Sequence, residues 1–365
     1  MFLFVLIYNL YLIDHGYAEN FLGLVTASMT AGGLAGALPA GWLGRRLEIN
    51  RTLRLCFLGS AGVSLLRAIV PGAPLLLASA FLGGAFLALW MVTMAPAVSR
   101  LVPEPHRPTA FSLFFGSGIG LGIVGGLVGG HLPEWFSAVG IPLSAIGAKR
   151  AVLITGCVFM ALAVVPLREL WFPPAGERTA KVYPRGPFIR RYLSVFVVWN
   201  LATGAFNPFF NAYLARLGAT TARIGVAFSA GQVAQLVAVI LAPWAYRRFG
   251  LVAGISLMMA LTGISLGGLA LSHAVTAGVL AYCLYMAFQW MSEPGMYSLL
   301  MNNVRPEEQS GAAALNFLAI SGAQAVSAAL SGALHNRFGY SVGLAAAALV
   351  GLLAALLLSR LLREK

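Results

Sequence analysis

The feature that most constrains this chain is a succession of long apolar stretches separated by short polar or basic loops. We count twelve stretches, at 1–13, 21–43, 52–70, 74–98, 110–132, 151–170, 192–215, 223–245, 251–271, 274–300, 311–333 and 341–361. A helix needs about 20 apolar residues to cross ~30 Å of hydrocarbon, so every stretch but the first is long enough. The stretches lack the ~10-residue alternation of membrane β-strands. The sequence therefore predicts an all-α, polytopic membrane protein with 12 transmembrane helices.

Charge supports this class and argues against a nucleic-acid partner. Only 10% of residues are charged, whereas soluble domains carry about 25%. The net charge of +13 comes from Arg and Lys in the loops between apolar stretches, where the positive-inside rule places them. Of the 24 Lys and Arg residues, 18 fall on one predicted side, together with the central connection and the C-terminus. We therefore predict a multi-pass protein of the cell (inner) membrane, with linker and C-terminus in the cytoplasm and no nucleic-acid partner.

A short phrase occurs twice, as GWLGRRL from Gly41 and as PWAYRRF from Pro243. Further matches occur at the same offset of 202 positions, including Tyr11 with Tyr213 and Gly16 with Gly218. The repeat predicts two parallel six-helix bundles, at 1–170 and 191–365, joined by a basic linker at 171–190. Parallel repeats are typical of membrane proteins that open a central site alternately to the two sides.

The repeated pattern resembles the major facilitator superfamily over essentially the whole chain. That family carries a Gly-x-x-x-Asp-Arg-x-Gly signature after helix 2 and a weaker copy after helix 8. Gly41 and Arg46 match the first copy, and Arg248 and Gly250 match the second. The acidic position is Arg45 in one copy and Arg247 in the other, so the usual acid-centred network cannot form in the same way. The resemblance implies a cytoplasmic gate that contains Arg45, Arg46, Arg247 and Arg248.

The repeat also predicts a shortened first helix. Met1 aligns with Thr203, whereas the equivalent stretch begins near Tyr192, so about 11 residues have no counterpart. The 13 residues present would reach only about 20 Å. We expect either that the true start lies upstream or that the chain is a shortened version.

Polar residues are sorted unevenly among the apolar stretches. Stretches 3, 6, 9 and 12, which the resemblance places against lipid, contain no amide or acid. Polar groups are costly in hydrocarbon and normally face a bundle interior or a wet cavity. In 192–215, the spacing of Asn200, Asn207 and Asn211 predicts one helical face. We therefore predict a substrate cavity lined mainly by the second half, with these residues: Tyr11, Trp90, Asn200, Asn207, Asn211, Gln232, Gln235, Gln289, Trp290, Asn316 and Gln324.

Glu293 is the only acidic residue well inside a predicted span, and Pro294 and Gly295 beside it would loosen the helix. Two interpretations stay open. Glu293 is either a protonatable group that couples proton movement to transport, or a structural acid bonded to freed backbone or to an Arg.

Trp90, Trp199 and Trp290 also allow two readings, an aromatic wall of the cavity or helix packing. The stretch at 110–132 carries a four-residue stripe of Gly118, Gly122, Gly126 and Gly130. Such stripes let helix backbones approach closely, so we predict helix packing there. No histidine pair has metal-ligand spacing, and the three cysteines lie in apolar stretches, so we expect no metal and no cofactor.

These observations predict a secondary active transporter, not an enzyme, that moves a small solute by alternating access. The predicted partners are a small-molecule substrate, membrane lipid and, if Glu293 acts, protons; the protein is expected to be a monomer. Neutral amides beside aromatic rings argue against a highly charged substrate and favour export over uptake. The alternative is a transport-inactive sensor or scaffold with a transporter-like fold.

Overall fold

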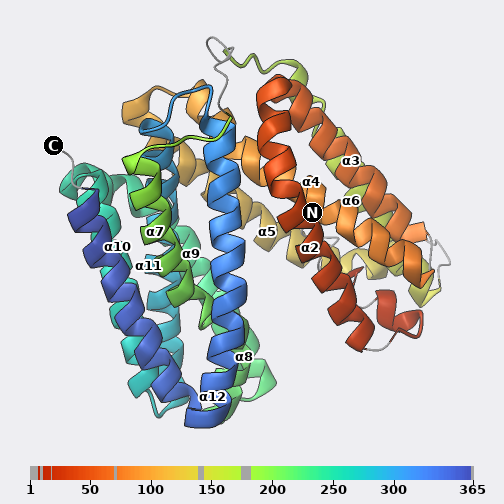
Figure 1. Cartoon of the computed structure of the whole chain (residues 1–365). Coiled ribbons are helices and arrows are strands. Elements are labelled where there is room, and N and C mark those ends of the chain that lie inside the picture. Colours follow the sequence, from red (N-terminus) through yellow and green to blue (C-terminus); the bar gives the residue numbers. More distant parts are fainter. Residues whose placement is uncertain are drawn as a thin grey trace. The chain divides into compact units, whose positions relative to one another are not determined.

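The computed structural model describes residues 7–8, 11–17, 19–69, 72–138, 144–173 and 182–362. Every element in these ranges is an α-helix or a 3₁₀ helix, and they contain no strand (Figure 1). The expected all-α fold is therefore confirmed for the described chain. Most of the first apolar stretch lies outside these residues, and with it the expected shortening of the first helix.

The chain divides into two compact units. Unit 1 comprises Met1–Leu101, Gly120–Tyr183 and Pro306–Phe317, and unit 2 comprises Val102–Ile119, Pro184–Arg305 and Leu318–Lys365. The first half of the sequence thus contributes 102–119 to unit 2, and the second half contributes 306–317 to unit 1. These two segments therefore belong to the unit formed mainly by the other half of the sequence. The predicted boundaries at 170 and 191 stay a prediction.

Unit 1 is built on α2 (Glu19–Arg46), α3 (Ile49–Ile69), α4 (Ala73–Leu101) and α6 (Ala145–Leu162). Helix α4 packs against both α2 and α3, and α3 also packs against α6. Short 3₁₀ turns follow α4 at Glu104–His106 and α6 at Pro166–Arg168, both at proline-containing segments. Helix α5 (Arg107–Ala138) begins in unit 2 and continues into unit 1.

Unit 2 contains α7 (Pro187–Gly204), α8 (Phe210–Arg216), α9 (Thr221–Phe249), α10 (Leu251–Leu271) and α11 (Val275–Asn302). Helix α11 packs against α9 and α10. The element α12 (Gln309–Leu361) covers the two predicted stretches 311–333 and 341–361, and its backbone breaks at Gly339, where φ is 81°. The left-handed conformation is easily reached only by glycine, so Gly339 allows the chain to turn there.

The stretch at 192–215 is not one continuous helix. Helix α7 ends at Gly204, a 3₁₀ turn covers Asn207–Phe209, and α8 begins at Phe210. Pro208 has no backbone N–H and its ring clashes with a helical carbonyl, which explains the interruption. The expectation that Asn200, Asn207 and Asn211 share one helical face assumed an unbroken helix. Regular helical spacing ends at Gly204, so it does not relate Asn200 to the other two residues.

The sequence repeat has a structural counterpart at the end of the first helix of each half. Gly16 and Gly218 both adopt positive φ, 82° and 87°, and their amides bond carbonyls three residues back. The hydroxyl of Tyr11 donates to the carbonyl of Ala68 at 2.7 Å, and that of Tyr213 donates to Leu269 at 2.7 Å. Equivalent tyrosines therefore tie equivalent helices together in the two units.

Close backbone packing involves α2 and α4. A Cβ added to Gly32 would lie 1.9 Å from the carbonyl oxygen of Phe81, and one added to Gly84 would lie 1.8 Å from that of Met29. In the predicted glycine stripe of α5, by contrast, a Cβ on Gly118 would meet nothing within 4 Å. Gly122 is half-buried, and the surroundings of Gly126 and Gly130 lie outside the described residues.

Ten helices of the described chain are long and apolar enough to cross a membrane. Large apolar side chains are exposed along them, such as Phe159 at 63% in α6 and Leu349 at 69% in α12. Aliphatic and aromatic surface of this extent is suited to contact with lipid acyl chains. The count of twelve transmembrane helices stays a prediction.

Candidate functional site

Asn200, which is buried, and Gln324, which is half-buried, form an amide pair in unit 2. The Gln324 amide Nε2 donates to Asn200 Oδ1 at 3.1 Å, and Asn200 Nδ2 donates to the carbonyl of Phe196 at 2.9 Å. Asn200 is 4% exposed. Gly204 lets the two helices approach here, because a Cβ on it would lie 2.9 Å from Gln324 Cα. Two predicted cavity residues from α7 and α12 therefore contact each other.

Asn207 and Asn211 lie beyond the interruption of the helix. The Tyr285 hydroxyl donates to Asn207 Oδ1 at 2.7 Å, which joins the 3₁₀ turn to α11. Asn207 keeps an exposed surface despite this bond, and Asn211 is exposed. Tyr285 was not among the predicted site residues, and a phenol in an apolar stretch gives little sequence signal.

The remaining amides differ in exposure. Gln235 and Gln289 are buried in unit 2, and neither side-chain Oε1 has a hydrogen-bond partner among the described residues. Gln232 is half-buried on α9. Asn316 is buried in the 306–317 segment of unit 1, and its Oδ1 also has no partner in the described chain. Unsatisfied buried acceptors are costly, so a ligand or water with a donor would stabilise them.

The aromatic residues fall in two environments. Trp290 of α11 is half-buried and lies 6.4 Å from Phe115 between ring centroids, within unit 2. Trp90 of α4 packs on Phe57 at 5.3 Å in unit 1, in a cluster that also contains Leu53. Tyr11 is 1% exposed and accepts a bond from Arg150 Nε at 3.2 Å. Trp90 and Tyr11 thus occupy packed positions in unit 1.

Glu293 lies on α11 among aromatic side chains of unit 2. Its half-buried carboxyl interacts with the Trp199 indole of α7 and, electrostatically, with the hydroxyls of Tyr192, Tyr246 and Tyr297. Within the described chain, Glu293 forms no ion pair with an Arg or Lys. The Trp199 indole is a neutral donor, so the carboxyl can exchange a proton without breaking a salt bridge.

Tyr246 of α9 bonds to the backbone of α11, two residues from Glu293. Its hydroxyl donates to the carbonyl of Met291 and accepts a bond from the amide of Gly295 at 3.1 Å. In a regular helix this amide and this carbonyl would bond each other. The Tyr246 hydroxyl therefore bonds the amide and the carbonyl of one helical turn next to Pro294. A side chain inserted between such backbone groups is a recognised cause of helix bending.

Gly295 makes room for this arrangement. A Cβ at that position would lie 2.7 Å from Tyr246 Cζ and 2.6 Å from Ile255 Cγ1. Sequence reasoning identified the Glu-Pro-Gly segment but missed Tyr246. A usable signal existed, because Tyr246 stands within the repeated Trp-x-x-Arg-Arg phrase where the first copy has Gly44.

The four predicted gate arginines end α2 and α9. Arg45 is half-buried, and the Arg46 guanidinium lies 4.0 Å above the Trp42 ring, both in unit 1. Arg247 and Arg248 are exposed in unit 2. Within the described residues, no group of three His, Cys, Asp or Glu side chains is placed to hold a metal ion.

Taken with the internal repeat, these spans define a multi-pass membrane protein built from duplicated helical segments, the class to which transporters with parallel repeats belong. The sequence profile of the Major Facilitator Superfamily matches residues 1–200 and 192–365. The chain belongs to this family of transporters. A search of curated protein sequences found no match.

Solved structures share the fold at low sequence identity. The fucose:proton symporter FucP of E. coli superposes with a TM-score of 0.78 at 16% identity, over 98% of this chain and 96% of that one. The human organic anion transporter MFSD10 gives 0.73 at 16% identity, over 96% and 88%. The proton:xylose symporter XylE, bound to 6-bromo-6-deoxy-D-glucose, gives 0.71 at 16% identity, over 97% and 92%.

Proposed function

We propose that this chain is a secondary transporter that moves a small neutral solute by alternating access and couples this movement to protons through Glu293. The observation that carries the proposal is the placement of Glu293. It lies on helix α11 next to Pro294, half-buried, beside Trp199 and without an ion pair among the described residues. An intramembrane acid is a functional candidate by default, because its burial is costly.

The expected solute follows from polar and aromatic side chains of unit 2, the unit that contains Glu293. Asn200, Gln324 and Gln289 offer amide donors and acceptors, and Trp290 offers an aromatic surface. Such groups suit a solute with hydroxyl or amide groups and one apolar face. The fold neighbours named for fucose and xylose transport make monosaccharides the first compounds to test.

The proposal also covers the oligomeric state, the membrane orientation and the direction of transport. We infer a monomer in the cell (inner) membrane, with the C-terminus in the cytoplasm, from the concentration of Arg and Lys on one side. We also infer export as the direction of transport, which flux measurements in oriented vesicles would test.

The coupling is tested with the purified full chain in proteoliposomes. A thermal-shift screen of monosaccharides and other neutral solutes first identifies a ligand, and its uptake is then measured with and without a pH gradient. Glu293→Gln should abolish gradient-driven accumulation while exchange of solute across the membrane continues. Glu104→Gln, an exposed acid in the η1 turn, serves as the matched control and should transport normally.

Full gradient-driven accumulation by Glu293→Gln would refute the coupling. A ligand that shifts the melting temperature but never crosses the membrane, with or without a gradient, would instead support the transport-inactive sensor. The absence of an acid at the Arg45 and Arg247 positions is the observation in favour of that alternative.

A further inference from the structure

A cavity of about 470 Å³ lies in unit 1, and Glu293 is not among its lining residues. It is lined by the end of α2, the start of α3, the end of α4, the segment 170–173 and the start of α12. The proposed substrate and proton-coupling residues do not line this cavity, although the predicted gate residues Arg45 and Arg46 do. Three of the lining residues are arginines, Arg45, Arg46 and Arg100.

The positive charge of these arginines is only partly neutralised. Arg45 is half-buried and makes no hydrogen bond or ion pair within the described chain. Arg100 reaches two carbonyls at long distances, 3.5 Å to Pro173 and 3.3 Å to Pro306, and its buried Nε has no partner among the described residues. Desolvated guanidinium groups favour an anion, and phosphate or carboxylate matches their planar donor geometry.

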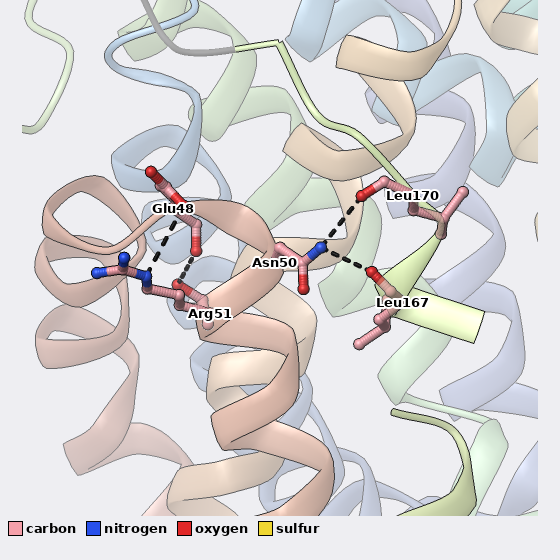
Figure 2. Close-up of polar contacts among 6 residues, drawn as sticks. Glu48, Asn50, Arg51, Leu167 and Leu170 are labelled. Carbon is pink, nitrogen blue, oxygen red and sulfur yellow. Dashed lines mark hydrogen bonds and ion pairs between the residues drawn. The ribbon is translucent and has the colours of Figure 1, made fainter. Parts of the chain in front are cut away.

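The two acids in the lining leave an excess of positive charge. Glu48 is engaged by Arg51 from outside the cavity, at 3.8 Å (Figure 2). Glu307 interacts electrostatically with Arg100. Arg45 therefore contributes a positive charge that no carboxylate pairs with in the described chain.

The wall of the cavity is held in place before any ligand binds. Asn50 Nδ2 donates to the carbonyl of Leu167 at 2.7 Å and to that of Leu170 at 3.1 Å (Figure 2). These bonds fix the segment after α6 against the start of α3. The Oδ1 of Asn50 is buried and has no partner in the described residues.

The surroundings suggest where an anion would come from. Trp171 is 73% exposed and Trp42 is 43% exposed, and both lie at this end of unit 1. Exposed tryptophans beside arginines are typical of the membrane–water interface, where anionic lipid headgroups lie. Arg45 also stands where the family signature has an acid, so this chain has a cation at a position that is normally negative.

We propose that this cavity binds the phosphate of a phosphate ester, held by Arg45 and Arg100, with Arg46 at its rim. Two sources share this chemistry, the headgroup of an anionic phospholipid and a soluble phosphate monoester. The proposal is independent of solute transport.

The test titrates the full chain, purified in a neutral detergent, with three probes: dihexanoyl-phosphatidylglycerol, dihexanoyl-phosphatidylcholine and glycerol 3-phosphate. The thermal unfolding midpoint reports binding. Phosphatidylglycerol, glycerol 3-phosphate or both should raise the midpoint, and phosphatidylcholine, whose phosphate is neutralised by choline, should raise it less. A shift with phosphatidylglycerol alone identifies a lipid site, and an equal shift with glycerol 3-phosphate identifies a phosphate-ester site open to water.

Loss of one charge-assisted contact should weaken apparent affinity about tenfold in Arg100→Gln and in Arg45→Gln. The matched control is Arg247→Gln with Arg248→Gln, which removes the equivalent arginines of the second repeat from exposed positions and should bind normally. Arg45 makes no hydrogen bond within the described chain, whereas Arg100 bonds two carbonyls, so Arg45→Gln remains informative if Arg100→Gln unfolds. Equal shifts in wild type, Arg45→Gln and the control, or no shift with either anionic probe, would overturn the proposal.

Discussion

The hydroxyl of Tyr246 and the amide of Gly295 are 3.1 Å apart and form a hydrogen bond that links α9 to the backbone of α11. The same hydroxyl donates to the carbonyl of Met291, so one side chain bonds both an amide and a carbonyl of the same helical turn. Glu293 lies inside that turn. The position of the carboxyl is thus tied to α9 as well as to its own helix.

Removal of this hydroxyl should destabilise the protein. Tyr246→Phe leaves the Gly295 amide and the Met291 carbonyl without their buried partner, which costs about 1–3 kcal/mol. Unfolding midpoints in detergent measure the effect. Tyr297→Phe is the control, because its hydroxyl makes no hydrogen bond within the described residues, and it should change stability little. An unchanged midpoint in Tyr246→Phe would mean that the Gly295 amide and the Met291 carbonyl bond each other when the hydroxyl is removed.

A methyl group at Gly295 should be destabilising because of Tyr246. Gly295→Ala puts its Cβ within 2.7 Å of Tyr246 Cζ, and such overpacking costs about 1–3 kcal/mol. In a double-mutant cycle with Tyr246→Leu, the combined loss should be smaller than the sum of the single losses. Strict additivity would show that the clash with Ile255, and not Tyr246, dominates.

The contact of α2 with α4 should tolerate no side chain at Gly32. Gly32→Ala places a Cβ 1.9 Å from a backbone oxygen, which cannot move without displacing α4, so we expect a loss of about 3 kcal/mol. Gly118→Ala has open space around it and removes a poor helix former, so stability should rise by up to about 1 kcal/mol. The two variants are compared by thermal unfolding, and the opposite order would contradict the packing described here.

The repeated tyrosines should contribute comparably. Tyr11→Phe and Tyr213→Phe each remove one buried bond to a carbonyl, worth about 1 kcal/mol. Tyr11 also accepts from Arg150, so Tyr11→Phe is expected to cost somewhat more. The two losses should add in the double variant, because the residues lie in different units and share no partner. A cooperative loss would count against this independence.

The hydrogen bond between Asn200 and Gln324 should contribute more to stability than the exposed side chain of Asn211. Asn200→Ala leaves the half-buried Gln324 amide without its acceptor and should lower stability by about 1 kcal/mol. Asn211→Ala removes an exposed side chain and should be close to neutral. Equal effects of the two changes, measured by unfolding, would indicate that the pair is open to water.

The sequence predicted well the features that the two copies of the repeat share. It predicted poorly the positions where a helix is broken. A shared offset identified Tyr11 with Tyr213, and the structure gives them matching bonds. The common face of Asn200 and Asn211 failed because Pro208 breaks the helix between them, and helical spacing holds only for an unbroken helix. Pro208 was available in the sequence, but its effect depends on whether neighbouring groups can satisfy the freed backbone.

The contact of Tyr246 with α11 is a second feature that the sequence did not predict. Its hydroxyl acts on a helix 45 residues away in sequence, and no local pattern encodes such a contact. Comparison of the two copies of the repeat gives the only pointer, since Gly44 in the first copy cannot supply a hydroxyl. Differences between otherwise matching copies are therefore as informative as the matches.

The exchange of 102–119 and 306–317 between the units bears on how this chain can be made in pieces. A polypeptide cut in the linker would yield two fragments, and each would lack one segment of its own unit while carrying one that belongs to the other. Neither fragment could complete its packing alone. Co-expressed fragments would have to associate to become stable, and a fragment produced without its counterpart should be degraded.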